Sequence, residues 1–286
     1  MVEATFDAVL CQSRLDTRWV GRRIAVRHEL ESTNDEAWES LGGGAPSGLA
    51  IVADIQTRGR GRAGRTWHQA PGRGLALSVL MLARERFPLD VVPLLAGLAL
   101  AEGLESLSVG TELKWPNDLL IRGRKAAGVL CESRSLPSPR PASPRGGSAA
   151  GDDEETPRRA VVIGAGVNVA ECPEDFPPGI AGSATSLLIE GRDLGREEVA
   201  AAFLNRLERL WVLAEGGGSA PILREWRRRA VFWGRRVQVN APSGRLAGVA
   251  EDLDPEGRLV LRLDDGSRTA LVAGDIELEP GTRIAR

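Results

Sequence analysis

Apolar residues in the first two thirds of the chain gather in short runs, which polar and glycine-containing turns separate. The runs at residues 112–115 and 118–121 are followed by a third at residues 126–132. The turn at residues 122–125, which leads into this third run, predicts an antiparallel hairpin. Together the runs predict a sheet of several strands. The predicted strands are residues 24–29, 48–56, 74–82, 112–115, 118–121, 126–132 and 160–169.

Helical spacing of apolar residues occurs in the same part of the chain. Positions three and four apart predict core helices over residues 91–107 and 197–213. Another helix is expected directly after the first strand, where Ser32 or Thr33 is placed to cap a helix that carries Trp38. Strands and helices in this order predict an α+β fold with a mixed sheet.

The C-terminal part has a different pattern, because short strands there alternate with the turns PSG, PEG and DDG. This alternation predicts a small β-barrel of roughly SH3 size. We therefore expect two domains: residues 1–230, which hold the mixed sheet and its helices, and residues 231–286, which form the SH3-like barrel.

Residues 133–159 interrupt the strand pattern with Pro, Ser, Gly and Arg, an acidic run and a single leucine. A stretch with so little to bury is typical of disorder. We expect an insertion without a function of its own, which replaces a hairpin turn and leaves the strands on either side unchanged.

Composition excludes several classes of protein. Lysine and arginine total 37 against 39 acidic residues, a net charge of -2, which argues against non-specific binding to nucleic acid or to an anionic membrane. No window approaches a membrane span and no leader is expected, so we predict a cytoplasmic location. The few possible nitrogen and sulfur ligands do not suggest a zinc site or a disulfide framework. They are Cys11, Cys131, Cys172, His28 and His68.

The most informative stretch is GRGRAGRTW at residues 59–67, called here the glycine loop. Its spacing matches a dinucleotide fingerprint and nearly matches a P-loop, but both need a helix directly after the glycines. The following residues have no helical period, so we reject both interpretations. A loop bearing Arg60, Arg62 and Arg65 instead suits an anionic ligand, and a solvated basic loop or an RNA contact is the competing interpretation.

Two further stretches carry polar groups at the ends of predicted strands. KWPND at residues 114–118, followed by Lys125, could place cations and a carboxylate at one end of the hairpin, although an ordinary Asn-Asp turn is the plainer interpretation. GAGVN at residues 164–168 would let a ligand ring approach the backbone, with Asn168 reading the edge of a base. By itself, a buried Asn with its hydrogen bonds satisfied explains the second stretch better.

In this order, ESTN at 31–34, DIQxxGRGRxGRxW at 54–67, KWPND at 114–118, KxAGVL at 125–130 and GAGVNV at 164–169 together closely resemble the biotin protein ligase family. The resemblance covers residues 24–278 and implies the class II synthetase-like catalytic domain of that family, with its small C-terminal barrel. It also implies a reaction. Biotin and ATP form biotinoyl-AMP with release of pyrophosphate, and a lysine of a biotin carboxyl carrier protein then takes the biotin.

The resemblance assigns a role to each matching residue. Catalysis is expected of Arg62, Lys125 and Asp118. Contact with biotin is expected of Ser32, Thr33, Asn34, Gln56, Arg60, Gly61, Arg62, Lys125 and Gly128. Contact with ATP is expected of Arg60, Arg65, Trp67, Lys114, Asn117 and Asn168. The resemblance implies Mg²⁺ together with ATP, near Asp118, and no tightly bound metal. No protein nucleophile is needed, which fits a chain with only two histidines.

Other functions remain to be weighed against this one. A lipoate ligase or octanoyl transferase would share the fold, but the arginine motif with consecutive glycines and the placed cysteine of those enzymes are missing. A nucleic-acid-binding module would use the glycine loop and the barrel, but near-neutral charge argues against it. Residues 1–23 are too few for the helix-turn-helix of bifunctional family members, so we expect no repressor function. The resemblance leaves a homodimer open.

Overall fold

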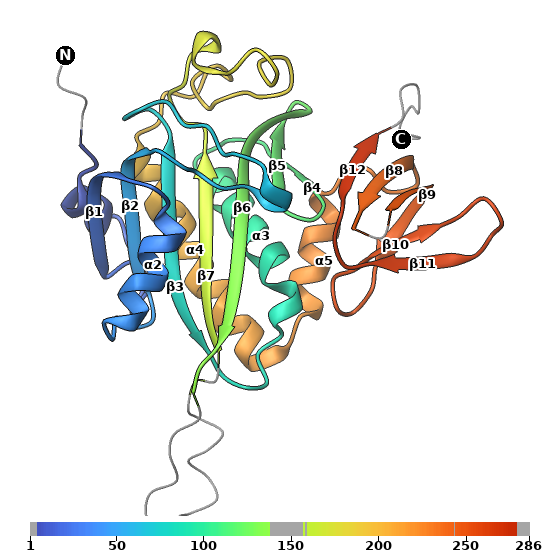
Figure 1. Cartoon of the computed structure of the whole chain (residues 1–286), viewed down its shortest axis with the longest axis horizontal. Coiled ribbons are helices and arrows are strands. Elements are labelled where there is room, and N and C mark those ends of the chain that lie inside the picture. The colour runs from blue at the N-terminus through green and yellow to red at the C-terminus, as the bar shows by residue number, and fades with distance from the viewer. Residues whose placement is uncertain (1–4, 138–156, 158, 243, 279–286) are drawn as a thin grey trace, which may run out of the picture.

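The computed structural model describes residues 5–137, 157, 159–242 and 244–278. Its larger layer is a seven-stranded sheet in the order β1-β2-β3-β7-β6-β5-β4, drawn at the left and centre of Figure 1. The pair β1 and β2 is parallel, and every other neighbouring pair in this sheet is antiparallel. The strands are β1 (Arg23–Leu30), β2 (Leu49–Gln56), β3 (Leu75–Ala83), β4 (Glu112–Lys114), β5 (Asp118–Ile121), β6 (Arg124–Ser135) and β7 (Arg159–Val167).

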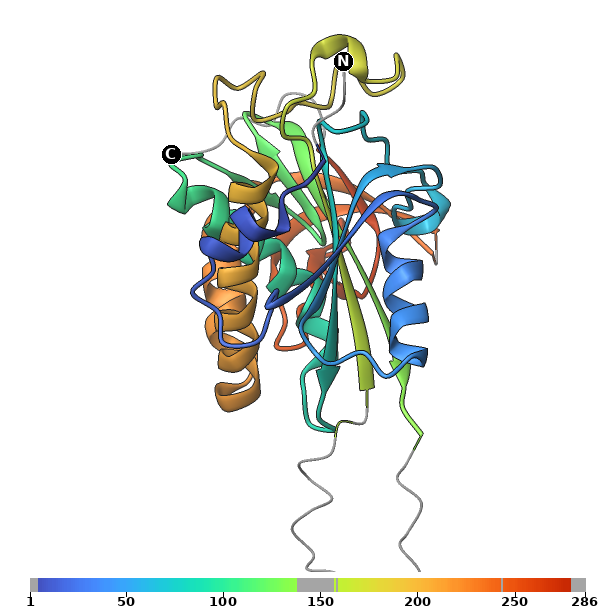
Figure 2. The ribbon, with the colours of Figure 1, turned by 90° about the vertical axis from the view of Figure 1, so that its left-hand side faces the viewer.

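Helices cover both faces of this sheet, as the edge-on view in Figure 2 shows. α2 packs on one face against β2, β3 and β7, while α3 and α4 cover the other. Successive residues of β2 accordingly enter opposite cores: Ile51 joins Trp38 of α2, and Val52 joins the larger cluster under α3 and α4. Burial on both faces explains why β2 and β3 are almost continuously apolar. The helices are α1 (Ala8–Ser13), α2 (Thr33–Gly42), α3 (Val92–Ser106), α4 (Arg196–Gly217) and α5 (Ala220–Arg229).

The predicted hairpin and the strands around it are present, and one predicted boundary is wrong. β6 continues to Ser135 and β7 begins at Arg159, and these two residues are partners in an antiparallel ladder. The ends of the expected insertion at 133–159 therefore belong to the sheet. Backbone hydrogen bonds hold these polar residues in place, and composition does not reveal a ladder. Residues 138–156 and 158 of the expected insertion lie outside the described residues.

The helix predicted after the first strand is α2, and Ser32 occupies its N-cap position with extended backbone angles. Its side chain, however, makes no capping hydrogen bond. The side chain of Gln56 on β2 takes over part of this role, because its Oε1 accepts from the backbone N–H of Thr33 at 2.8 Å. The start of α2 is thereby attached to the end of β2.

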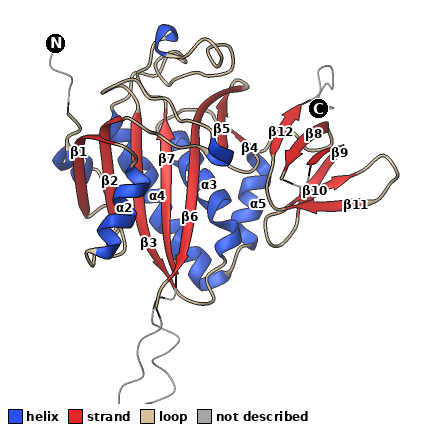
Figure 3. Cartoon of the chain, viewed as in Figure 1, coloured by secondary structure: helices blue, strands red, loops and turns tan. Residues whose placement is uncertain are grey.

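The C-terminal strands form a second, antiparallel sheet in the order β11-β10-β9-β8-β12, at the right of Figures 1 and 3. It lies against the first unit, where the indole Nε1 of Trp115 donates to the carbonyl of Gly257 at 3.1 Å. The predicted domain boundary at residue 230 falls between α5 and β8 and stays a prediction. The strands are β8 (Arg236–Ala241), β9 (Gly244–Leu253), β10 (Leu259–Arg262), β11 (Arg268–Leu271) and β12 (Asp275–Leu278).

The mixed sheet with its helices and the small C-terminal antiparallel sheet confirm the α+β fold class. Among the described residues, no helix combines the length and the apolar character needed to cross a membrane.

Candidate active site

The glycine loop leaves the end of β2 and crosses in front of β7 and β6 toward the C-terminal sheet (Figure 1). It folds back on itself: the N–H of Gly61 donates to the carbonyl of Arg65 at 2.7 Å, and the N–H of Trp67 to that of Gly59 at 2.9 Å. Its tip is a single 3-10 turn, Arg62–Gly64, in which Ala63 has a left-handed φ of 52°. No α-helix follows the glycines, which confirms that the dinucleotide and P-loop interpretations were rightly rejected.

The three arginines of the loop reach three different parts of the molecule. Arg60 pairs with Asp35 of α2 at 2.7 Å and with Glu132 of β6 at 3.2 Å. Arg62 donates to Oδ1 of Asn117 at 3.1 Å in the turn between β4 and β5. Arg65 pairs with Asp275 at the start of β12 at 2.6 Å. The loop is thus held from three directions.

Two cavities lie beside the glycine loop, and all three of its arginines line both. The larger, of about 670 Å³, opens between the loop, the start of α3 and the C-terminal sheet. The smaller, of about 270 Å³, lies over β6 and β7 and collects nearly all of the predicted site residues. Those lining it are Ser32, Thr33, Asn34, Gln56, Arg60, Gly61, Arg62, Arg65, Trp67, Asn117, Asp118, Lys125, Gly128 and Asn168.

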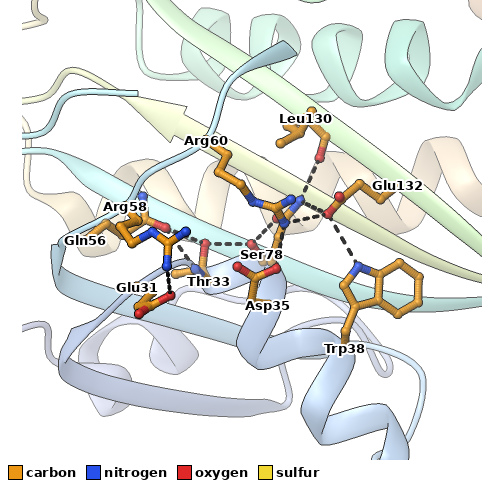
Figure 4. A network of polar contacts seen from close by, with 11 residues as sticks. Glu31, Thr33, Asp35, Trp38, Gln56, Arg58, Arg60, Ser78, Leu130 and Glu132 are labelled. Atoms are coloured by element: carbon orange, nitrogen blue, oxygen red, sulfur yellow. Dashed lines mark hydrogen bonds and ion pairs between the residues drawn. The ribbon is translucent and has the colours of Figure 1, made fainter. Parts of the chain in front are cut away.

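A continuous chain of polar contacts runs beside the smaller cavity (Figure 4), and four of its members, Thr33, Asn34, Gln56 and Arg60, line that cavity. The Thr33 hydroxyl lies 3.1 Å from Gln56 Oε1 and 2.7 Å from the Ser78 hydroxyl. Ser78 in turn donates to Oδ1 of Asn34 at 2.6 Å. Asn34 then donates from Nδ2 to Oε2 of Glu132 at 2.8 Å, the same oxygen that pairs with Arg60. We call this series, from Gln56 to Arg60, the polar chain.

The charged end of the smaller cavity is built on the hairpin. Lys125 Nζ lies 2.5 Å from Oδ1 of Asp118, and 5.7 Å from the centre of the Trp67 ring. The backbone N–H of Lys125 donates to the carbonyl of Ser183, and its carbonyl accepts from the N–H of Thr185, so these two hydrogen bonds fix the backbone of Lys125. Burial lowers the pKa of Arg62 below its usual value, an effect that the nearby carboxylate of Asp275 opposes. Lys125 and Arg62 together place positive charge at this end.

The space above the two glycines of β7 is filled by side chains of other residues. A Cβ on Gly164 would lie 2.3 Å from Oδ1 of Asn34, and one on Gly166 would lie 2.4 Å from the Trp67 ring. Residues two apart on a strand point to the same face. The glycines therefore let Asn34 and Trp67 lie flat on the sheet, where the sequence had suggested the approach of a ligand ring.

Asn168 and Lys114 differ from the other predicted residues. Asn168 lines the smaller cavity, but its Nδ2 donates inward to the carbonyl of Thr185 at 2.8 Å and to that of Lys125 at 3.4 Å. Lys114 lines neither of the two cavities beside the loop. It sits between Leu113 and Trp115, which are buried, so strand alternation turns its side chain away from theirs.

Several residues of the smaller cavity had no signal in the sequence. Phe176, Ile180, Ser183 and Ala184 line it from the irregular segment between β7 and α4, where no periodic pattern marks them. Ser78 and Glu132 complete the polar chain without lining this cavity, and they sit in strands, where a single polar residue does not signal a role in a site. Their partners are distant in sequence, so only the folded chain reveals them.

A metal held by protein side chains does not fit this site. Within the described residues, no three His, Cys, Asp or Glu side chains are grouped to hold an ion. Asp118, the predicted neighbour of Mg²⁺, has the Lys125 ammonium against its carboxylate. Mg²⁺ keeps several waters and commonly binds through substrate phosphates, so an ion at this site would have to arrive with the triphosphate.

Comparison with known proteins points to a single family. Residues 26–139 match the biotin/lipoate A/B protein ligase family, and residues 232–279 match the biotin protein ligase C terminal domain. The chain is 34% identical to the bifunctional ligase/repressor BirA of Bacillus subtilis, over 92% of this chain and 76% of that one. It is also 34% identical to a biotin–[acetyl-CoA-carboxylase] ligase of Mycobacterium tuberculosis, over 89% of this chain and 88% of that one.

The solved structures agree with the sequence relatives. A biotin protein ligase from Aquifex aeolicus, in complex with biotin and ATP, superposes with a TM-score of 0.71 at 25% identity. The superposition covers 90% of this chain and 99% of the other. Both the seven-stranded unit and the C-terminal sheet are therefore shared with that structure.

Proposed function

We propose how the site works from the premise that the chain is an enzyme of the biotin/lipoate A/B protein ligase family. The members of this family to which it is similar are biotin protein ligases. Biotin binds in the smaller cavity with its ring against the polar chain and its carboxylate toward Lys125. ATP places its α-phosphate at the same end, under the glycine loop. The carboxylate attacks the α-phosphorus, pyrophosphate leaves, and biotinoyl-AMP remains.

One observation carries this proposal: a single cavity is lined both by the neutral hydrogen-bonding side chains of Thr33, Asn34 and Gln56 and by the cations Lys125 and Arg62. Two anions, a carboxylate and a phosphate, must approach each other, and they repel unless positive charge offsets them. Lys125 and Arg62 lie where that charge is needed, and Asp118 holds the Lys125 ammonium in place. Preorganised cations of this kind stabilise the charge that develops during transfer.

The polar chain favours a ligand with N–H donors. The hydroxyl groups of Thr33 and Ser78 have one hydrogen each, yet three oxygen–oxygen contacts join them to each other, to Gln56 and to Asn34. The backbone N–H of Thr33 already fixes the Gln56 oxygen toward this group. The wall is therefore short of hydrogens. The ureido ring of biotin offers two N–H donors, whereas the dithiolane ring of lipoate offers none.

In the second step, the amine of an acceptor lysine attacks the carbonyl carbon of biotinoyl-AMP, AMP leaves, and an amide bond forms. We propose a biotin carboxyl carrier protein as the acceptor, in line with the name of the M. tuberculosis relative. Mg²⁺ enters with ATP. Residues 5–22 contain the short helix α1, and the proposal concerns ligation.

The test is exchange of labelled pyrophosphate into ATP by the purified chain, with biotin or lipoate as the second substrate. Exchange that depends on biotin and Mg²⁺ is the expected result. Exchange that depends on lipoate instead would overturn the choice of substrate. The absence of exchange with either acid would overturn the adenylation mechanism.

A further inference from the structure

Glu132 is not among the residues that the sequence motifs assign to substrates, yet its carboxylate joins three elements of the site. Oε2 accepts from Nδ2 of Asn34 at 2.8 Å, from Arg60 at 3.2 Å and from the indole of Trp38 at 3.4 Å. Asn34 and Trp38 belong to α2, Arg60 belongs to the glycine loop, and Glu132 itself lies on β6 (Figure 4).

The neighbours of Glu132 explain why its charge matters. Asn34 is 3% exposed, so its amide must be satisfied inside the protein. A carboxylate only accepts hydrogen bonds, which means that Nδ2 of Asn34 faces Glu132 and its Oδ1 faces Ser78. The carbonyl of Leu130 accepts from the same Nδ2 at 3.3 Å, so Glu132, at the shorter distance of 2.8 Å, and Leu130 together set the direction of hydrogen bonds in the polar chain.

The same oxygen holds the glycine loop. Arg60 is 40% exposed at its side chain and Glu132 is 29% exposed, so water screens the pair only in part. Arg60 has a second acidic partner, Asp35, at 2.7 Å. Asp35 touches neither Asn34 nor Trp38 through any hydrogen bond in the described contacts. Among the hydrogen bonds of the described residues, Glu132 is the group that connects Arg60 of the loop to Asn34.

We propose that Glu132 is a positioning residue, which couples closure of the glycine loop to the arrangement of the polar chain that receives the substrate ring. This inference rests on the proposed function. When Asn34 and Ser78 are in the arrangement that accepts the ring, the Glu132 carboxylate is held where Arg60 can reach it. The loop therefore closes over a correctly filled cavity, and the adenylate is kept from water and from stray amines.

The test compares Glu132→Gln with Asp35→Asn. Both changes remove the negative charge of one acidic partner of Arg60, but only Glu132→Gln also changes a hydrogen-bond partner of Asn34 in the polar chain. KM for biotin, kcat for pyrophosphate exchange and the fraction of adenylate released into solution are measured for each. Glu132→Gln should raise KM for biotin about tenfold, as expected for loss of a hydrogen bond to a charged group, and should release more adenylate. Asp35→Asn should change each quantity by less than about twofold.

Trypsin provides a readout that does not depend on catalysis, because the glycine loop contains three arginines. Biotin should protect the wild-type loop from cleavage and should protect the Glu132→Gln loop much less, with thermal melting used to confirm that both variants are folded. Wild-type values for Glu132→Gln in KM, adenylate release and loop protection would overturn the inference. Equal defects in the two variants would also overturn it, since charge on Arg60 alone would then explain them.

The wild-type enzyme separates this inference from its premise. Biotin-dependent exchange in the wild type, together with an unaffected Glu132→Gln variant, would reject Glu132 and leave the proposed function standing. No exchange in the wild type would reject the proposed function, and the role of Glu132 with it.

Discussion

The two sides of the glycine loop differ in how their buried polar groups are paired. On the leading side, residues 56–61, Gln56 and Arg60 are the two ends of the polar chain. On the trailing side, residues 65–74, several buried polar atoms lack a hydrogen-bond partner among the described residues. They are Nε1 of Trp67, Oε1 of Gln69 and both carboxyl oxygens of Glu171, which packs against Gly74.

An unpaired buried polar group costs free energy, about 1–3 kcal/mol each, so such groups concentrate where function needs them. The leading side is organised before any ligand arrives, which suits recognition of a rigid ring. On the trailing side, Trp67 lies beside Lys125, with the ammonium 5.7 Å from its ring, whereas Gln69 and Glu171 line neither cavity. We infer that biotin meets a fixed surface and that ATP meets one where the indole N–H of Trp67 still has a hydrogen bond to form.

The largest expected effect separates two lysines near the trailing side. Lys125→Met should slow formation of biotinoyl-AMP about a hundredfold or more, as loss of a preorganised cation does, whereas Lys114→Met should slow it far less because Lys114 lines neither cavity. Single-turnover assays measure this, with melting curves as a check of folding, since methionine keeps the packing of the stem. A wild-type rate for Lys125→Met, or a larger defect for Lys114→Met, would show that the α-phosphate lies elsewhere.

The next effect is on stability and concerns Glu171. Burial raises the pKa of this carboxyl from its usual 4.5 to about 7. The folded state therefore holds the proton more tightly than the unfolded state. The protonated carboxyl therefore makes a contribution to the free energy of unfolding that is fully present below pH 4.5. This contribution is lost as pH rises from 4.5 through about 7, by about 3 kcal/mol in all.

Glu171→Gln should remove this part of the pH dependence, because glutamine stays neutral. Urea unfolding at pH 5 and pH 8 measures it in the wild type, in Glu171→Gln and in the control Glu174→Gln, which changes an exposed residue of the same type. The same loss of stability in wild type and Glu171→Gln between the two pH values would contradict the assignment.

A smaller effect tests the comparison directly, through two glycines of one strand. Gly164→Ala should displace Asn34, which joins the polar chain of the leading side from α2, and Gly166→Ala should displace Trp67 on the trailing side. Overpacking of this kind costs about 1–3 kcal/mol, roughly a tenfold change in affinity. We expect Gly164→Ala to raise KM mainly for biotin and Gly166→Ala to raise it mainly for ATP.

Steady-state exchange with each substrate varied in turn measures both constants. If both variants raise the same constant, the two sides of the loop do not serve different substrates. The comparison would then have no functional meaning.

The smallest effect is expected at the outer edge of the trailing side. Asp275→Asn removes the partner of Arg65 on the C-terminal sheet, but both side chains are largely exposed, at 54% and 37%. Such pairs contribute about 0.2–1 kcal/mol. Adenylate formation should therefore fall by less than about fivefold, with a sensitivity to salt that is lower in the variant than in the wild type. A loss comparable to that of Lys125→Met would mean that the C-terminal sheet controls the loop.

The sequence by itself determined the strands, the main helices and the order of the motifs, because periodicity and turn residues are local properties of the chain. It also determined that the glycines at residues 59–64 are not followed by a helix. These features survive folding because no distant contact is needed to produce them. The family resemblance depends on the same local signals.

Only the tertiary structure decided which residues of those motifs meet. Ser78 and Glu132 complete the polar chain, and Phe176 and Ile180 line the cavity, through contacts between segments far apart in sequence. Lys114, a predicted ATP contact, lines neither of the two cavities, because strand alternation on β4 turns its side chain away from its buried neighbours. Hydrogen-bond partners and side-chain directions depend on how strands and helices pack, and no pattern along one segment contains that information.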